Sequence, residues 1–350
     1  MDIQVKSSED CQQVQHWLAK QGGSLGGLKA NGPTPEYIMG TLSPLQLHMP
    51  KLTRLHSIDI RMLRLQHNVS RVSTRSSTRK SMSSPLTGHD SRSNSSLVRS
   101  HSSAGAGAGA SAGVGASAVL PQLWELRLSF CRVTQHLASE LLGATTLSAL
   151  QWDNVTCTSN WTSTRKLSES IYSMLSSLIG LQELHLEVGS WDRTSAAGAN
   201  RLLAALQRLT QLRRLHLRAC GLQKAVHQPQ PEQQGASYQC YAALTASTNL
   251  TSLYVREEFD MPVPQAAFDH MLPTGRVLPN LRELTLVGRY PGNYLCVDAA
   301  QVARIAVSCP ALQQLRLLNV TPKGFDVSCL SQLPPAVTQV EGLEWRRPAA

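Results

Sequence analysis

The feature that most constrains the fold of this chain is a leucine pattern, L-x-x-L-x-L, that recurs through its C-terminal two thirds. Its seven copies begin at Leu123, Leu147, Leu181, Leu212, Leu250, Leu281 and Leu312. Successive starts differ by 24, 34, 31, 38, 31 and 31 residues. A single copy arises easily in a leucine-rich chain, whereas seven at quasi-regular spacing indicate a repeat architecture.

Two copies extend the pattern to a cysteine at the ninth position, namely Cys131 and Cys220. The other copies have different residues there: Val155, Gly189, Glu258, Arg289 and Val320. Weaker copies of the leucine pattern flank the array at Leu25/Leu28/Ala30, Leu55/Ile58/Ile60 and Val337/Val340. The repeat therefore covers most of the chain.

Within each copy the leucines alternate with polar residues, which is the signature of a strand with one buried face. Helical patterns lie between the copies, at residues 134–142, 166–178, 194–209, 236–246, 264–271 and 297–307. Alternating strands and helices predict a parallel sheet with helices on one side. Units of about 30 residues cannot close a core alone, so each must stack on its neighbours.

These motifs resemble leucine-rich-repeat proteins, and the ninth-position cysteines resemble the cysteine-containing or ribonuclease-inhibitor-like type found in F-box-associated arrays. The resemblance implies a right-handed α/β solenoid, or horseshoe, with a parallel concave sheet and outer helices. It also implies a non-enzymatic scaffold that binds a protein on the concave face.

A segment from residue 67 to residue 118 differs from its surroundings. It is rich in serine, carries six basic residues against the single acid Asp90, and ends in an Ala/Gly run. Such a composition cannot repay the entropy of ordering, which predicts a disordered insertion. The predicted organisation is thus degenerate repeats at 1–66, the insertion at 67–118, and the main array at 119–350.

The insertion contributes about half of the chain's net charge of +10. Basic residues three positions before a hydroxyl mark Thr78, Ser95 and Ser102 as candidate phosphorylation sites, and Ser84 precedes a proline. Phosphorylation there would remove the positive charge of the segment.

The cellular compartment follows from the N-terminus and the cysteines. The first residues show neither a basic nor an apolar signal region, and the eight cysteines include no C-x-x-C pair. Both features predict an intracellular, cytoplasmic protein with reduced thiols and no membrane contact. A cytoskeletal, axonemal or nuclear location is compatible with the same features.

The residues between the buried leucines are expected to face outward from the concave sheet. From two such rows we predict these partner-binding residues: Arg127, Gln151, His185, His216, Arg218, Tyr254, Arg256 and Arg316. Arginine and aromatic side chains commonly anchor protein interfaces. Charge reversal at Arg218 and Arg256 is expected to weaken partner capture.

His185 and His216 occupy equivalent positions of adjacent repeats, so they are expected to be neighbours. Two imidazoles do not make a zinc site without a third ligand, so no metal or cofactor is predicted and the pair is interpreted as surface residues with pH-sensitive binding. Cys131 and Cys220 are interpreted as buried structural thiols. The sequence has no H-E-x-x-H or G-x-S-x-G motif, and no catalytic residue is predicted.

Two alternative functions stay open. The F-box resemblance suggests substrate recognition for a ubiquitin ligase, although no F-box is visible in the sequence. The basic insertion suggests RNA binding, which would be sensitive to salt.

Overall fold

A computed structural model describes part of the chain. The described residues are 1–32, 45–47, 54–61, 65–67, 120–134, 138, 140, 143–157, 170–187, 196–222, 239–256, 270–288, 295–322, 326–343 and 345–346. Almost all of the predicted insertion, including Thr78, Ser84, Ser95 and Ser102, lies outside them, so its predicted disorder and phosphorylation stay predictions.

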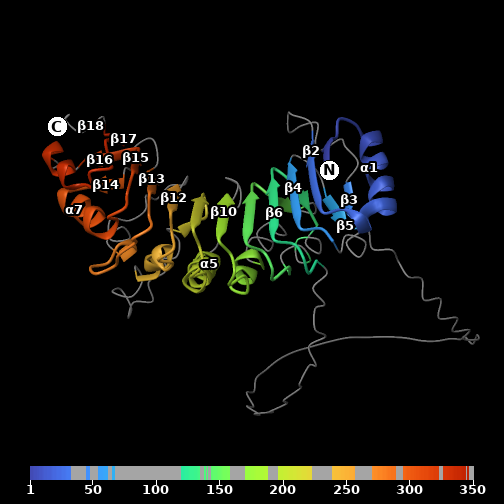
Figure 1. Cartoon of the computed structure of the whole chain (residues 1–350), viewed down its shortest axis with the longest axis horizontal. Coiled ribbons are helices and arrows are strands. Elements are labelled where there is room, and N and C mark those ends of the chain that lie inside the picture. The colour runs from blue at the N-terminus through green and yellow to red at the C-terminus, as the bar shows by residue number, and fades with distance from the viewer. Residues whose placement is uncertain are drawn as a thin grey trace, which may run out of the picture. The chain divides into compact units, whose positions relative to one another are not determined.

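One sheet of twelve strands runs through the described residues from the N-terminus to the C-terminus (Figure 1). In spatial order its strands are β1 (Asp2–Gln4), β2 (Gly27–Asn31), β4 (Ser57–Arg61), β6 (Glu125–Ser129), β8 (Ala149–Asp153), β10 (Glu183–Glu187), β11 (Arg214–Arg218), β12 (Ser252–Arg256), β13 (Glu283–Val287), β15 (Gln314–Leu318), β17 (Gln339–Glu341) and β18 (Trp345–Arg346). Every neighbouring pair is parallel except β17 with β18. Spatial order equals chain order, so each repeat adds one strand beside the last. The fold is a leucine-rich-repeat solenoid.

The strands pair in a register that superimposes the leucine motifs. The fourth motif position forms a row across the sheet: Leu126, Leu150, Leu184, Leu215, Leu253, Leu284 and Leu315. Each of these side chains is at most 2% exposed. The sixth position forms a second buried row, in which Trp152 and Val255 replace leucine. The predicted alternation of buried and outward residues is confirmed in most strands, whereas β8 and β13 also bury residues at outward positions.

The degenerate N-terminal copies belong to the same sheet. Leu28 on β2 lies opposite Ile58 on β4, and Ile58 lies opposite Leu126 on β6. Strand β4 therefore pairs directly with the first strand of the main array, although residues 62–64 and 68–119 between them lie outside the description. At the other end, the degenerate copy at Val337/Val340 supplies strand β17.

A left-handed residue ends several of the strands. Phe130, Asn154, Ala219 and Asn319 each follow a strand directly and have φ between 47° and 54°. The N–H groups of Phe130, Asn154 and Ala219 each donate to a carbonyl of the next strand at 2.8 Å. This backbone conformation costs an ordinary residue about 1–2 kcal/mol but is tolerated by asparagine. It turns the chain away from the sheet while the hydrogen-bond ladder stays complete.

The residue after this turn, at the ninth motif position, is buried either as a hydrogen-bonded cysteine or as an apolar valine. The Cys131 thiol donates to the carbonyls of Ile60 and Ser129 at 3.2 and 3.3 Å. The Cys220 thiol donates to the carbonyls of Leu186 and Arg218 at 3.6 and 3.4 Å. Each thiol thus links its own strand to the preceding repeat, as predicted for structural cysteines. Val155 occupies the same place without a donor, so a cysteine is not needed for the turn.

Helical segments connect the strands. Those described over their full length are α1 (Ser8–Gln21), η1 (Gly22–Ser24), α5 (Ala196–Arg208), η4 (Gln239–Thr245), α7 (Ala299–Ser308) and η5 (Val327–Gln332), where η is a 3₁₀ helix. Segment α5 packs against η4, and α7 packs against η5. Helix α7 begins with a capping box, in which Asp298 accepts from the Gln301 N–H and the Gln301 side chain accepts from the Asp298 N–H.

The predicted helices are confirmed at 194–209 and 297–307. The segment predicted at 236–246 is a 3₁₀ helix, and the segments at 134–142, 166–178 and 264–271 are described only in part. Sequence patterns did not predict three small parallel pairs beside the main sheet. These are β3 (Leu45–Leu47) with β5 (Leu65–His67), β7 (Arg132–Val133) with β9 (Thr156–Cys157), and β14 (Leu295–Val297) with β16 (Val320–Pro322).

Both ends of the core are covered by segments that lack the leucine pattern. At the N-terminal end, α1 buries Cys11, Val14 and Leu18. At the C-terminal end, β18 turns back antiparallel to β17 and buries Trp345. Among the described residues, no helix combines the length and apolar character needed to cross a membrane.

The C-terminal turn predicts a steric requirement for glycine. Gly342 has φ of 96°, and a Cβ there would lie 2.0 Å from the Leu317 carbonyl oxygen. Gly275 has a similar φ of 83° but nothing within 4 Å of a Cβ. We expect Gly275→Ala to cost about 1 kcal/mol of unfolding free energy and Gly342→Ala to cost about 2 kcal/mol more, measured by urea denaturation. Equal losses in the two variants would contradict this account of the turn.

The buried thiols predict low chemical reactivity. Burial raises the pKa of Cys309, which is fully buried just after α7, to about 12. At about pH 8 its thiolate population is then about 1000-fold below that of a thiol with the reference pKa of 9.0. We expect iodoacetamide to leave Cys309 unmodified in the native chain and to alkylate it in urea, as followed by peptide mass spectrometry. Alkylation of Cys309 at similar rates in the native and unfolded chains would show that the site is open to solvent.

Candidate functional site

The outward side of the main sheet carries the predicted binding residues in two neighbouring rows. We call this side the ladder face. It consists of the row listed next and the outward row two positions later in each strand. The register places the row members opposite one another in strand order: Asp59, Arg127, Gln151, His185, His216, Tyr254, Thr285 and Arg316. Arg218 lies opposite Arg256 in the next row. The structure therefore brings all eight predicted residues to one face.

Three rings are stacked at the centre of the row. The His185 and His216 ring centroids are 3.7 Å apart with an interplanar angle of 21°, which confirms the expected adjacency. The His216 and Tyr254 centroids are 3.9 Å apart at 10°. Parallel strands in register hold equivalent side chains about 4.8 Å apart, so planar rings at one position can stack face to face. The stack therefore spans β10, β11 and β12.

Both imidazoles have lowered pKa values. The pKa of His216 is lowered to about 3, mainly by burial and in addition by the neighbouring His185 and Arg218. Burial likewise lowers the pKa of His185, although Asp153 and Glu187 oppose this shift. With a pKa of about 3 the His216 ring does not change charge near neutral pH, and the pH-sensitive binding expected for this pair stays a prediction.

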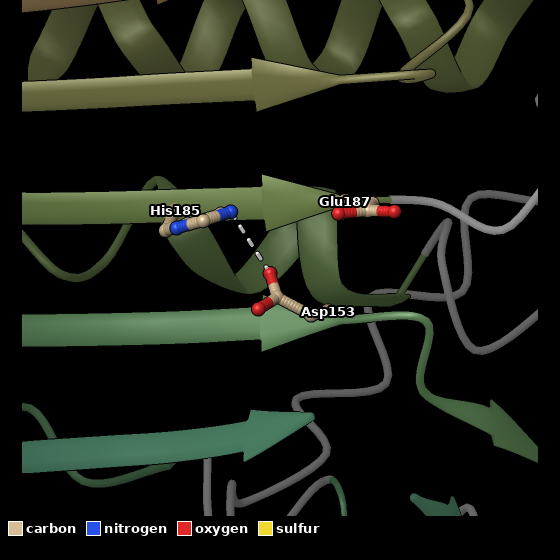
Figure 2. Close-up of side chains that lie close together, drawn as sticks. All are labelled: Asp153, His185 and Glu187. Atoms are coloured by element: carbon tan, nitrogen blue, oxygen red, sulfur yellow. Dashed lines mark ion pairs between the residues drawn. The ribbon is translucent and has the colours of Figure 1, made fainter. Parts of the chain in front are cut away.

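Asp153 is the most buried acid of the face, at 7% exposure. Its Oδ2 accepts from Ser129 Oγ at 3.2 Å and from Gln151 Nε2 at 2.6 Å. Its Oδ1 lies 3.1 Å from His185 Nε2 on the neighbouring strand (Figure 2). The sequence placed Asp153 in an outward row but gave no reason to select it. Asp153 lies opposite Glu187 on β10, and His185 precedes Glu187 by two residues. This grouping of three side chains can be recognised only once the strand register is known.

Most of the predicted arginines form ion pairs along the face. Arg127 Nη2 lies 2.6 Å from Glu125 Oε1, and Arg316 Nε lies 2.8 Å from Glu341 Oε2. Arg218 Nη1 lies 3.2 Å from Glu187 Oε1 and also donates to Oε2 at 3.2 Å. These three arginines therefore each have an acidic neighbour on the same face.

The face is not uniformly open. Thr285 and Val287 on β13 occupy outward positions of the sheet, yet they are only 8% and 7% exposed. The accessible polar row is therefore interrupted at β13 and resumes at Arg316 on β15. The candidate site is the stretch from β8 to β12, with the ring stack at its centre.

Comparisons with known proteins add little at the level of sequence. No family model matches the chain, and no curated protein matches it. Among solved structures, the chain is similar to an internalin from Listeria monocytogenes, with 12% identity over 91% of this chain and 72% of that protein, at a TM-score of 0.38. The assignment of the fold rests on the strand order and register given above.

Proposed function

We propose that this chain is a non-enzymatic scaffold that binds a protein partner on the ladder face between β8 and β12. The observation that carries the proposal is the ring stack of His185, His216 and Tyr254, which places three aromatic side chains side by side within a polar row. Rigid aromatic groups next to oriented arginines are the composition typical of interface hot spots.

The arrangement of the face supports the proposal because little ordering is needed on binding. Arg218 and Glu187 are already paired, and Asp153 is fixed by Ser129 and Gln151. Side chains held in one conformation lose less entropy when a partner docks, which favours affinity.

The finer family assignment is part of the same proposal. The thiol–carbonyl bonds of Cys131 and Cys220 are what the cysteine-containing repeat type would use at this position. Five described cysteines are buried thiols and not disulfides, which supports a reducing, intracellular location.

Two further hypotheses rest on the sequence alone. Co-purification with ubiquitin-ligase core subunits would support a role in substrate recognition. Deletion of residues 67–118 that abolishes a salt-sensitive RNA affinity would support RNA binding through the insertion.

The ring stack gives the sharpest test of the ladder face. A partner is first identified by proximity labelling in the native cell, and its Kd is then measured with purified proteins. We expect the double variant His216→Ala/Tyr254→Ala to weaken binding at least about 10-fold, because it removes two central aromatic contacts. These substitutions are cleaner than charge reversal at Arg218, which would also place a new carboxylate beside Glu187.

A matched control comes from the helical side of the repeats. Arg208 in α5 and Val307 in α7 are exposed, and the double variant Arg208→Ala/Val307→Ala should leave the Kd unchanged. Equal loss of binding in both double variants, or loss only in the control, would place the interface away from the ladder face.

A further inference from the structure

We propose that Asp153, His185 and Glu187 form a binding site for a divalent transition-metal cation of the zinc class. The three residues lie at the C-terminal ends of β8 and β10, and one ligand atom from each lies within 4.8 Å of the others. Figure 2 shows the His185 ring and the Asp153 carboxylate turned toward each other across the two strands, with Glu187 further along β10.

The register explains why these side chains meet. Asp153 is the direct cross-strand partner of Glu187, and His185 precedes Glu187 by two residues, so all three project from the same face. The two-histidine cluster considered from the sequence lacked a third ligand, whereas the structure supplies two carboxylates beside His185. One imidazole with two carboxylates is a donor set that zinc accepts.

Two atoms of this cluster are buried without a hydrogen-bond partner. They are Asp153 Oδ1 and His185 Nε2, which are only 3.1 Å apart. The imidazole is therefore not aligned to donate to the carboxylate. Both atoms are shielded from water, and neither has a hydrogen-bond partner. Such groups are rare in folded proteins and costly.

A shared cation would satisfy both atoms after a small adjustment. Zinc binds imidazole nitrogen and carboxylate oxygen at about 2.0–2.2 Å in tetrahedral geometry, so two ligands on one ion lie about 3.4 Å apart. The observed 3.1 Å is slightly shorter than this spacing, and a small rotation of either side chain would reach it. The same distance without alignment is a poor hydrogen bond but a suitable ligand pair.

Neighbouring groups hold the ligands in place. Ser129 and Gln151 occupy Asp153 Oδ2, which leaves Oδ1 for the cation. Asn154 Nδ2 donates to Glu187 Oε1 at 2.8 Å and so orients the third carboxylate. Partners of this kind, one step outside the ligands, fix ligand orientation in metal sites.

Arg218 opposes cation binding because its guanidinium lies 3.2 Å from Glu187. Arg218 therefore limits the affinity for the cation. Its removal should tighten cation binding, whereas removal of a ligand should weaken it.

The test is titration of the purified full chain with Zn²⁺ after removal of metal by chelation. We expect one equivalent to bind by calorimetry at about pH 7.5, with Mg²⁺ giving no binding because it prefers oxygen ligands and octahedral geometry. Asp153→Asn and His185→Gln should each weaken binding at least about 10-fold. Arg218→Gln should tighten it about 3-fold or more, since a nearby positive charge is removed.

Controls distinguish this site from others in the chain. Arg214 lies on β11, the strand that also carries Arg218, and pairs with Glu183 at 3.0 Å. The variant Arg214→Gln should leave the zinc affinity unchanged. His16→Gln, in α1, should also have no effect. If Asp153→Asn does not fold, Glu187→Gln takes its place. The visible spectra of the Co²⁺-loaded wild type and of Co²⁺-loaded Glu187→Gln are then compared. We expect a four-coordinate spectrum for the wild type and its loss in Glu187→Gln.

Either of two results overturns the proposal. One is the lack of saturable zinc binding by the wild type, and the other is unchanged affinity in both Asp153→Asn and His185→Gln. Neither measurement involves a protein partner, so failure here leaves the scaffold proposal standing.

Discussion

In-register pairing of parallel strands is the interaction on which the rest of this structure depends. A single repeat exposes its leucines, and they become buried only when the same motif positions of two neighbours lie against them. Burial of one leucine contributes about 1.5–3 kcal/mol, so rows such as Leu184, Leu215 and Leu253 supply most of the driving force. A shift of one residue would turn the polar row into the core, so the register is strongly specified.

The turn after each strand is set by backbone conformation more than by the residue that follows. Asn154 and Ala219 both adopt left-handed φ, yet they are followed by Val155 and Cys220. The cysteine adds a thiol bond to the preceding repeat, whereas valine adds apolar burial alone. A ninth position that varies is therefore compatible with a regular ladder, and this explains why only two copies of the motif are complete although the described strands of the array pair in register.

The sequence was sufficient to predict the strands that carry the leucine motif, their direction and the composition of the ladder face, because leucine spacing reports directly on burial. It also predicted the contact between His185 and His216, since equivalent positions of adjacent repeats must meet. The closing strand β18 and the small side sheets were missed because they carry no leucine period. Asp153 was missed for a different reason: its burial depends on Ser129 and Gln151 from the neighbouring strand and its own, and only the register brings these groups together.

The same constraint that builds the core also shapes the chemistry of the opposite face. Strands about 4.8 Å apart force polar side chains at equivalent positions into contact, and these contacts exclude water. The consequence is visible in the pKa of His216, which burial lowers to about 3, and in the unsatisfied oxygen of Asp153. Arg214 and Glu183, by contrast, remain solvated although they too are neighbours across strands. Since the cost of desolvation between β8 and β12 is already incurred in folding, a partner or cation that binds there gains more from each contact than it would from a solvated row.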